Sequence, residues 1–339
     1  MPTTRFFHVT AKGKLTRFQT LEEALAARKR GGYIYLDYAD PTREALTALV
    51  EPLDVHPLSV EDCLDDKQVP KIEDFPKNTF VLVNRFNYHD RTLTIDEVDF
   101  VLGLDYLVCV HPERPDHDQL LARLEEPASV DMENVRRGPD FLLHVIVDFI
   151  VDRKYAAIEA LQEEVDEAEE AVLKDAATFQ PEQLLHLRRC LLTLRKSLFH
   201  EREILVKVCR KDSPFVTEKA LYHFRDVYDH LAKFFELTEI YREMITSLME
   251  MHLAMQNNRM ARLANRTNLI VRRLTMITTI FMPLTLLAGV GGMSEWSMMT
   301  GAANWPITYP LFMAGMVTIG AASYGVLRWM ESRTREDDA

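Results

Sequence analysis

The chain has 339 residues, 27% of them charged, and a formal net charge of −12. Its length allows two or three domains, each with a core of its own. The negative charge argues against nucleic-acid binding, which needs a concentrated basic surface. No basic amino-terminal region precedes an apolar run, so we expect no cleaved signal peptide. Four dispersed cysteines form no CxxC pair and favour reduced thiols over a disulfide framework or a zinc site.

Residues 1 to about 125 alternate between strand-like and helical stretches. Three stretches are rich in β-branched and aromatic residues, which is typical of strands: residues 32–38, 79–86 and 98–111. Residues 42–53 and 56–66 read as short helices, and prolines separate these stretches. We therefore predict a cytoplasmic α/β domain over residues 1–138.

From Pro139 onward the sequence is typical of long helices. Residues 140–174 contain no proline or glycine, and seven of the twelve residues 159–170 are acidic. Such a run usually forms a solvated helix face. A second helix is predicted over residues 181–212, beginning at a proline that suits a first turn.

The third predicted helix is unusually long. Residues 217–282 contain neither proline nor glycine, and at 1.5 Å per residue they would extend on the order of 100 Å. A helix of that length must pack against the preceding helical hairpin or against copies of itself. We predict a helical stalk domain over residues 139–271 within a symmetric oligomer.

Two apolar stretches follow, residues 274–294 and 305–327, and neither contains a charged residue. Each is long enough to cross a bilayer, which takes about 20 residues. Their succession favours transmembrane helices over the alternative, buried helices of a soluble protein. We predict a two-helix transmembrane pore domain over residues 272–339, with an outer loop over 294–305.

The charges that flank these stretches predict their orientation. The outer loop carries one charge, Glu295. Basic residues precede the first stretch and follow the second: Arg272, Arg273, Arg328, Arg333 and Arg335. Basic residues stay on the cytoplasmic side, so we expect an inner-membrane protein with both termini in the cytoplasm.

One face of the long helix repeats with the 3.5-residue period of bundled helices. Asn268, Thr275, Met282 and Gly289 follow at heptad spacing, and a second set lies between them: Val271, Thr278, Thr285 and Gly292. Within a membrane this face is small and polar, which suggests a water-filled pore. The alternative is that the threonines only bond their own helix backbone.

Residues 272–296, RRLTMITTIFMPLTLLAGVGGMSEW, resemble the signature of the CorA family of divalent-cation channels. Four more segments resemble the family in the same order: residues 55–65, 70–83, 224–230 and 265–275. The resemblance implies a homopentameric funnel of the α+β class in which the long helices line the pore. The pore-lining positions would be Asn268, Val271, Leu274, Thr275, Thr278, Met282, Thr285 and Gly289.

The sequence departs from the family at the expected mouth of the pore, residues Gly291, Gly292, Met293, Ser294 and Glu295. Gly291 stands where the family has tyrosine, and Ser294 replaces the asparagine of the family's GMN tripeptide. An asparagine ring can hold hydrated Mg²⁺, which gives up its water reluctantly. A serine hydroxyl also bonds water but reaches less far, so we expect a wider ring. Glu295 would add negative charge that attracts cations.

The family resemblance also implies an inhibitory metal site between neighbouring cytoplasmic domains. It points to Asp226 on the long helix and to Asp90 in the hairpin after residues 79–86. Divalent cations (Mg²⁺, Zn²⁺, Co²⁺ or Ni²⁺) would be both substrate and regulatory ligand, and no other cofactor is expected. No GxxxxGK[ST] loop is present to drive transport with nucleotide. Two alternatives stay open: a ZntB-like Zn²⁺ transporter, with or without proton coupling, and a non-conducting membrane scaffold or sensor.

Overall fold

The computed structural model describes residues 3–10, 14–65, 68–113, 130–175, 178–292, 298 and 301–337. The chain divides into two compact units, residues 1–252 and 253–339, and each is described by itself below. The predicted three-part division, with boundaries at residues 138 and 271, stays a prediction.

The first unit contains a seven-stranded sheet in the order β2-β1-β3-β7-β6-β5-β4. The strands are β1 (Thr3–Val9), β2 (Leu15–Phe18), β3 (Tyr33–Ala39), β4 (Lys71–Asp74), β5 (Thr79–His89), β6 (Thr92–Leu102) and β7 (Tyr106–His111). Strands β3 and β7 pair in parallel, and all other neighbours are antiparallel. Both strands of the parallel pair are buried along their whole length, which explains their nearly continuous apolar sequence.

The strands predicted over residues 32–38 and 79–86 correspond to β3 and β5. The single strand predicted over 98–111 is wrong, because the chain turns after Leu102 and returns as β7. Gly103 makes this turn tight: a Cβ atom there would lie 2.2 Å from Cε1 of Tyr106. Both strands are apolar up to the turn, so the hydrophobic pattern alone did not reveal the break.

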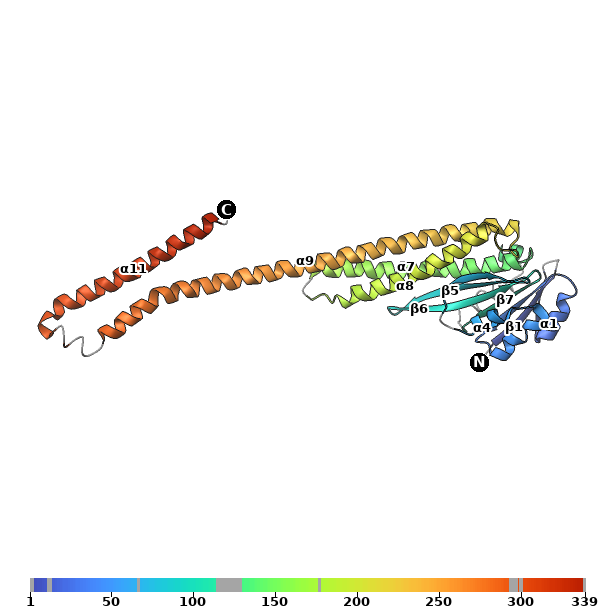
Figure 1. Ribbon diagram of the computed structural model, residues 1–339, viewed down its shortest axis with the longest axis horizontal. Coiled ribbons are helices and arrows are strands. Elements are labelled where there is room, and N and C mark those ends of the chain that lie inside the picture. The colour runs from blue at the N-terminus through green and yellow to red at the C-terminus, as the bar shows by residue number, and fades with distance from the viewer. Residues whose placement is uncertain are drawn as a thin grey trace. The chain divides into compact units, whose positions relative to one another are not determined.

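Helices cover both faces of the sheet (Figure 1). One face packs on four short helices: α1 (Leu21–Arg28), α2 (Arg43–Thr47), α3 (Val50–Leu53) and α4 (Pro57–Asp62). The other face packs on long helices, α7 (Pro139–Lys174) with α8 (Glu182–Cys209) and the first part of α9 (Glu218–Gly291), while α6 (Val130–Val135) precedes α7. Alternate residues of β3 point to opposite faces of the sheet. Ile34 and Leu36 belong to the hydrophobic core under the short helices, and Tyr35 belongs to the core under the long helices.

The three long helices confirm the predicted α+β architecture. Helix α9 has 74 residues and continues through Pro283 to Gly291, so it runs into the apolar stretch 274–294 that was predicted to cross the membrane. Proline removes one backbone donor from the helix interior, but the remaining hydrogen-bonded turns carry the helix across it.

The second unit holds the end of α9, a short 3₁₀ helix η1 (Ala302–Asn304) and α11 (Trp305–Asp337). Two helices in the described part of the chain are long and apolar enough to cross a membrane, and their apolar segments are not buried within the chain. Helices α9 and α11 approach each other closely at Gly320, where a Cβ atom would lie 3.7 Å from Cδ1 of Leu284.

Candidate metal centre and pore face

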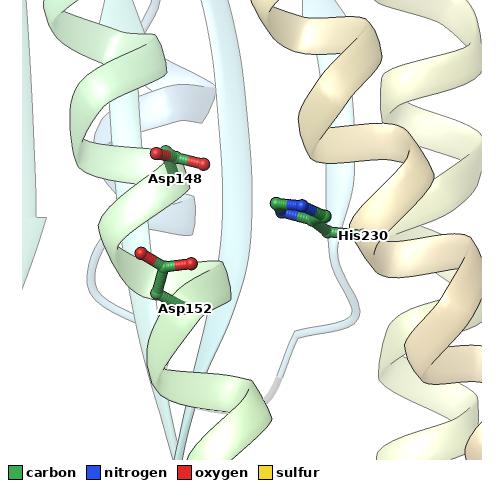
Figure 2. Close-up of side chains that lie close together, drawn as sticks. All are labelled: Asp148, Asp152 and His230. Atoms are coloured by element: carbon green, nitrogen blue, oxygen red, sulfur yellow. The ribbon is translucent and has the colours of Figure 1, made fainter.

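Helices α7 and α9 bring together two carboxylates and an imidazole in the first unit. One ligand atom from each of Asp148, Asp152 and His230 lies within 4.8 Å of the other two. Asp148 and Asp152 are four residues apart and therefore share one face of α7. Figure 2 shows both carboxylates on the side of α7 that faces the His230 ring. Asp152 is exposed, whereas Asp148 and His230 are partly buried.

The donor set suits a divalent cation. Carboxylate oxygens are the ligands that Mg²⁺ prefers, and an imidazole nitrogen suits Zn²⁺, Co²⁺ and Ni²⁺. Ligand atoms about 2.1 Å from an ion lie at most about 4.2 Å from one another. Only one such pair can lie that far apart: three ligand atoms at equal separations around one ion lie at most about 3.6 Å from one another, so the cluster would close further on binding a metal.

Aromatic contacts fix the spacing of the two helices on either side of the cluster. The rings of His144 and His223 lie 5.0 Å apart, and those of Tyr155 and Phe234 lie 5.7 Å apart. Each pair joins α7 to α9, one before the cluster along α7 and the other after it. The cluster is thus held between two packed contacts rather than on a loop.

Asp226, the metal-binding carboxylate predicted on the long helix, lies one turn before His230 on α9. The two residues are four apart and share a side of the helix, and Asp226 is exposed to solvent. Sequence reasoning missed Asp148, Asp152 and His230. The four-residue spacing of the two aspartates was a signal, but it gains meaning only once α7 is known to pack against α9.

Asp90, the second predicted metal ligand, lies at the tip of the β5–β6 hairpin. Asp90 and Arg91 have φ of 47° and 61°, as in a two-residue type I′ turn. The Asp90 side chain is 88% exposed. Arg91 fixes the tip against α7, with guanidinium nitrogens 3.7 Å from a carboxylate oxygen of Glu164 and 3.3 Å from one of Glu167.

The chain does not bring Asp90 and Asp226 together. The hairpin tip contacts α7 at Glu164, whereas the metal cluster beside Asp226 uses Asp148, sixteen residues earlier (164 − 148). Sixteen helical residues extend about 24 Å. A metal that bridges Asp90 and Asp226 therefore needs two copies of the chain.

A buried ion pair holds α7, α8 and the sheet together. Lys154 is fully buried and donates a hydrogen bond to Glu201, whose Oε1 accepts one from the backbone N–H of Asn84 at 2.9 Å. The Asn84 side chain also donates to Ser197 Oγ at 2.8 Å. Burial lowers the pKa of Lys154, and the Glu201 carboxylate opposes that shift. These contacts join three elements in one network.

The predicted pore residues lie on an exposed face of α9 in the second unit. This holds for all eight of them: Asn268, Val271, Leu274, Thr275, Thr278, Met282, Thr285 and Gly289. The residues that approach α11, Leu284 and Gly291, are partly covered. The exposed stripe is therefore free of α11 and available to other copies or to water.

The threonines of this stripe bond their own helix, as the alternative interpretation expects. Their hydroxyls donate to the carbonyl oxygen four residues earlier, at 2.9 Å for Thr275 and Thr278 and 2.8 Å for Thr285. A hydroxyl oxygen that donates its proton keeps lone pairs that can accept from water. These internal bonds therefore do not prevent the same oxygens from lining a pore.

At the predicted mouth, Gly291 ends α9, and the Gly292 N–H donates to the Ala288 carbonyl at 3.0 Å. Met293, Ser294 and Glu295 lie outside the described residues. A Cβ atom at Gly291 would lie 2.7 Å from Cζ of Phe312 on α11. The phenylalanine ring thus occupies the space that the family's tyrosine would enter.

Comparison with known proteins agrees with this architecture. The model of the family described as CorA-like Mg²⁺ transporter protein matches residues 30–328. A cobalt/magnesium transport protein CorA from Thermotoga maritima is 30% identical over 268 residues, 78% of this chain and 73% of the relative. The CorA magnesium transporter structure from Methanocaldococcus jannaschii aligns with a TM-score of 0.68 at 23% identity, covering 96% of this chain and 97% of that one. The ZntB cytoplasmic domain from Vibrio parahaemolyticus shares the fold of the soluble part, with a TM-score of 0.60 at 11% identity over 75% of this chain and 98% of that domain.

Proposed function

The chain belongs to the CorA-like Mg²⁺ transporter family, and from that premise we propose that five copies form a channel for divalent cations. The protein is a membrane transporter of metal ions rather than an enzyme. We place it in the inner membrane with both termini in the cytoplasm, on the strength of the arginines that flank the two spans. Mg²⁺, Zn²⁺, Co²⁺ and Ni²⁺ are the candidate permeant ions.

In this proposal cations flow passively through a pore lined by the exposed stripe of α9. Moving one charge across 100 mV is worth about 2.3 kcal/mol, so a divalent cation gains about 4.6 kcal/mol. That driving force makes nucleotide hydrolysis unnecessary. The apolar side chains of Leu274 and Met282 would form a hydrophobic gate, from which water is readily expelled. The five residues from Gly291 to Glu295 would form the outer mouth and select the ion.

The Asp148–Asp152–His230 cluster carries the proposal that cytoplasmic metal controls the pore. A bound cation would tie α7 to α9, the helix that continues into the first membrane span. Without the cation, Asp148 and Asp152 repel each other, and only the packing contacts between α7 and α9 remain. Differential binding of the metal to the tied state supplies the coupling free energy that allosteric inhibition needs. Asp226, one turn away, would join the same control.

Uptake into liposomes that contain the purified protein tests this function. We expect Mg²⁺ or Co²⁺ to enter down an imposed potential, and cytoplasmic-side metal to slow that entry. An absence of flux for Mg²⁺, Zn²⁺ and Co²⁺ under every potential and pH gradient would leave the scaffold or sensor alternative.

A Zn²⁺ transporter is the second candidate, and His230 is the observation that favours it. An imidazole nitrogen suits Zn²⁺ better than Mg²⁺. Zn²⁺ flux that depends on an imposed pH gradient, without Mg²⁺ flux, would establish this reading over the first.

A further inference from the structure

The helical hairpin α7–α8 carries two uncompensated faces of opposite charge. On α7, four carboxylates form one stripe at spacings of four, three and four residues: Glu159, Glu163, Asp166 and Glu170. All four are exposed, and none has an ion-pair partner in the described part of the chain. Their side of the helix is opposite the buried side that includes Leu161, Val165 and Ala168. We call these four residues the acidic stripe.

Helix α8 carries an apolar and basic face on its own outer side. Leu185, Leu192 and Phe199 repeat every seven residues and are 40%, 43% and 48% exposed. Arg188, Arg189 and Lys196 flank them, are exposed, and likewise have no ion-pair partner among the residues that the structure describes. We call these six residues the basic face.

The two surfaces stand at the same level of the hairpin. Arg91 shows this directly, because its side chain pairs with Glu164 and Glu167 of α7 while its carbonyl accepts a 2.8 Å hydrogen bond from Nε2 of His186 on α8. On α7, the acidic stripe extends to both sides of Glu164 and Glu167. On α8, the basic face begins next to His186. A neighbour related by rotation about an axis along the helices would keep this level, so its acidic stripe would meet the basic face without any shift.

We infer that the basic face of α8 binds the acidic stripe of α7 from a second copy of this chain. The contact is heterologous, and repeated by rotation it closes a ring. It would bury the three apolar side chains and neutralise facing charges, which gives specificity as well as attraction. We expect the basic face to bind a second copy and not an anionic membrane surface, because the hairpin itself carries a matching acidic surface at the same height. This inference rests on the proposed ring, but not on ion flux.

Charge reversal in the full-length protein tests the contact. Arg189→Glu/Lys196→Glu should raise the monomer-to-oligomer ratio, measured by native mass spectrometry in mild detergent, roughly tenfold, since several weak pairs are lost around each ring. Adding Glu163→Lys/Glu170→Lys to the same chain should restore the wild-type ratio. Arg43→Glu/Lys219→Glu is the matched control, because both residues are exposed and lie outside α7 and α8.

Carbodiimide cross-linking gives a second readout. In a mixture of isotopically light and heavy copies, Lys196 should form light–heavy amide links to residues of the acidic stripe. Oligomers that are unchanged by the reversal and carry no such links would overturn the contact while leaving the ring intact. A wild-type protein that is monomeric under all conditions would instead refute the ring itself. If the charge reversal changes the protein's behaviour only in nanodiscs of anionic lipid, the membrane is the partner of the basic face. That result would also overturn the proposed contact between copies.

Discussion

Single side chains decide how the first unit holds together. The Lys154–Glu201 pair lies between α7, α8 and β5, where neither charge reaches water. A buried charge is tolerated when it is paired and fully hydrogen-bonded, and is costly when its partner is removed. The pair therefore couples the long helices to the sheet at one point.

Lys154→Met should destabilise the protein by about 3–5 kcal/mol, because it leaves the Glu201 carboxylate buried without a cation. Adding Glu201→Leu should recover most of that loss. Thermal unfolding followed by intrinsic fluorescence would measure both. Equal stability of the single and double variants would show that Glu201 finds another partner.

His230 should determine which cations the α7–α9 cluster prefers. We expect His230→Gln to weaken Co²⁺ and Zn²⁺ binding about 10–100-fold and Mg²⁺ binding much less, because only the softer ions favour imidazole over water. Calorimetric titration of the full-length protein measures this, with His200→Gln on α8 as the control. An equal loss for all three ions would assign His230 a packing role.

At the scale of elements, the membrane unit depends on close approach between α9 and α11. Gly291 leaves the space that the Phe312 ring fills. The sequence shows only a glycine where the related family has tyrosine. The physical reason for the glycine appears only when α11 is seen to pack against α9.

Gly291→Tyr should therefore separate the ends of α9 and α11 and lower the thermal unfolding midpoint, since overpacking typically costs about 1–3 kcal/mol. Phe312→Ala in the same chain should relieve the overlap and restore part of the loss. Additive effects of the two substitutions, rather than mutual compensation, would contradict this account.

At the scale of the whole molecule, α9 belongs to both units, because it carries His230 in the first unit and a candidate membrane segment in the second. In the proposed control of the pore, a metal-dependent change in its first part would reach the second through this helix. The rotational register of α9 therefore matters to the proposed control of the pore.

One alanine inserted after Asn257 should rotate everything beyond it by about 100° and uncouple flux from cytoplasmic metal. A seven-residue insertion leaves the later part of α9 rotated by only about 20° from its original orientation. This variant should therefore retain more of the inhibition by metal. Liposome flux with and without cytoplasmic-side metal compares the two. Unaltered inhibition after the single insertion would mean that the signal does not pass along α9.

The sequence by itself determined the features that depend on local pattern. Helix length follows from the absence of proline and glycine, membrane segments from uncharged runs, and most strands from β-branched clusters. It also identified the family, because the motif at residues 272–296 is contiguous. The sequence pattern did not reveal the turn at Gly103, because the strands on both sides of that turn are apolar.

Only the tertiary structure decided which distant residues meet. The separation of Asp90 from Asp226 and the joining of Asp148 and Asp152 with His230 both follow from how α7 packs on α9 and on the β5–β6 hairpin. Helix periodicity specifies the face on which a side chain lies, but not the partner that covers it. The pairing of helices follows from the burial of apolar surface summed over many residues, and the meeting of Asp148, Asp152 and His230 is a consequence of that packing.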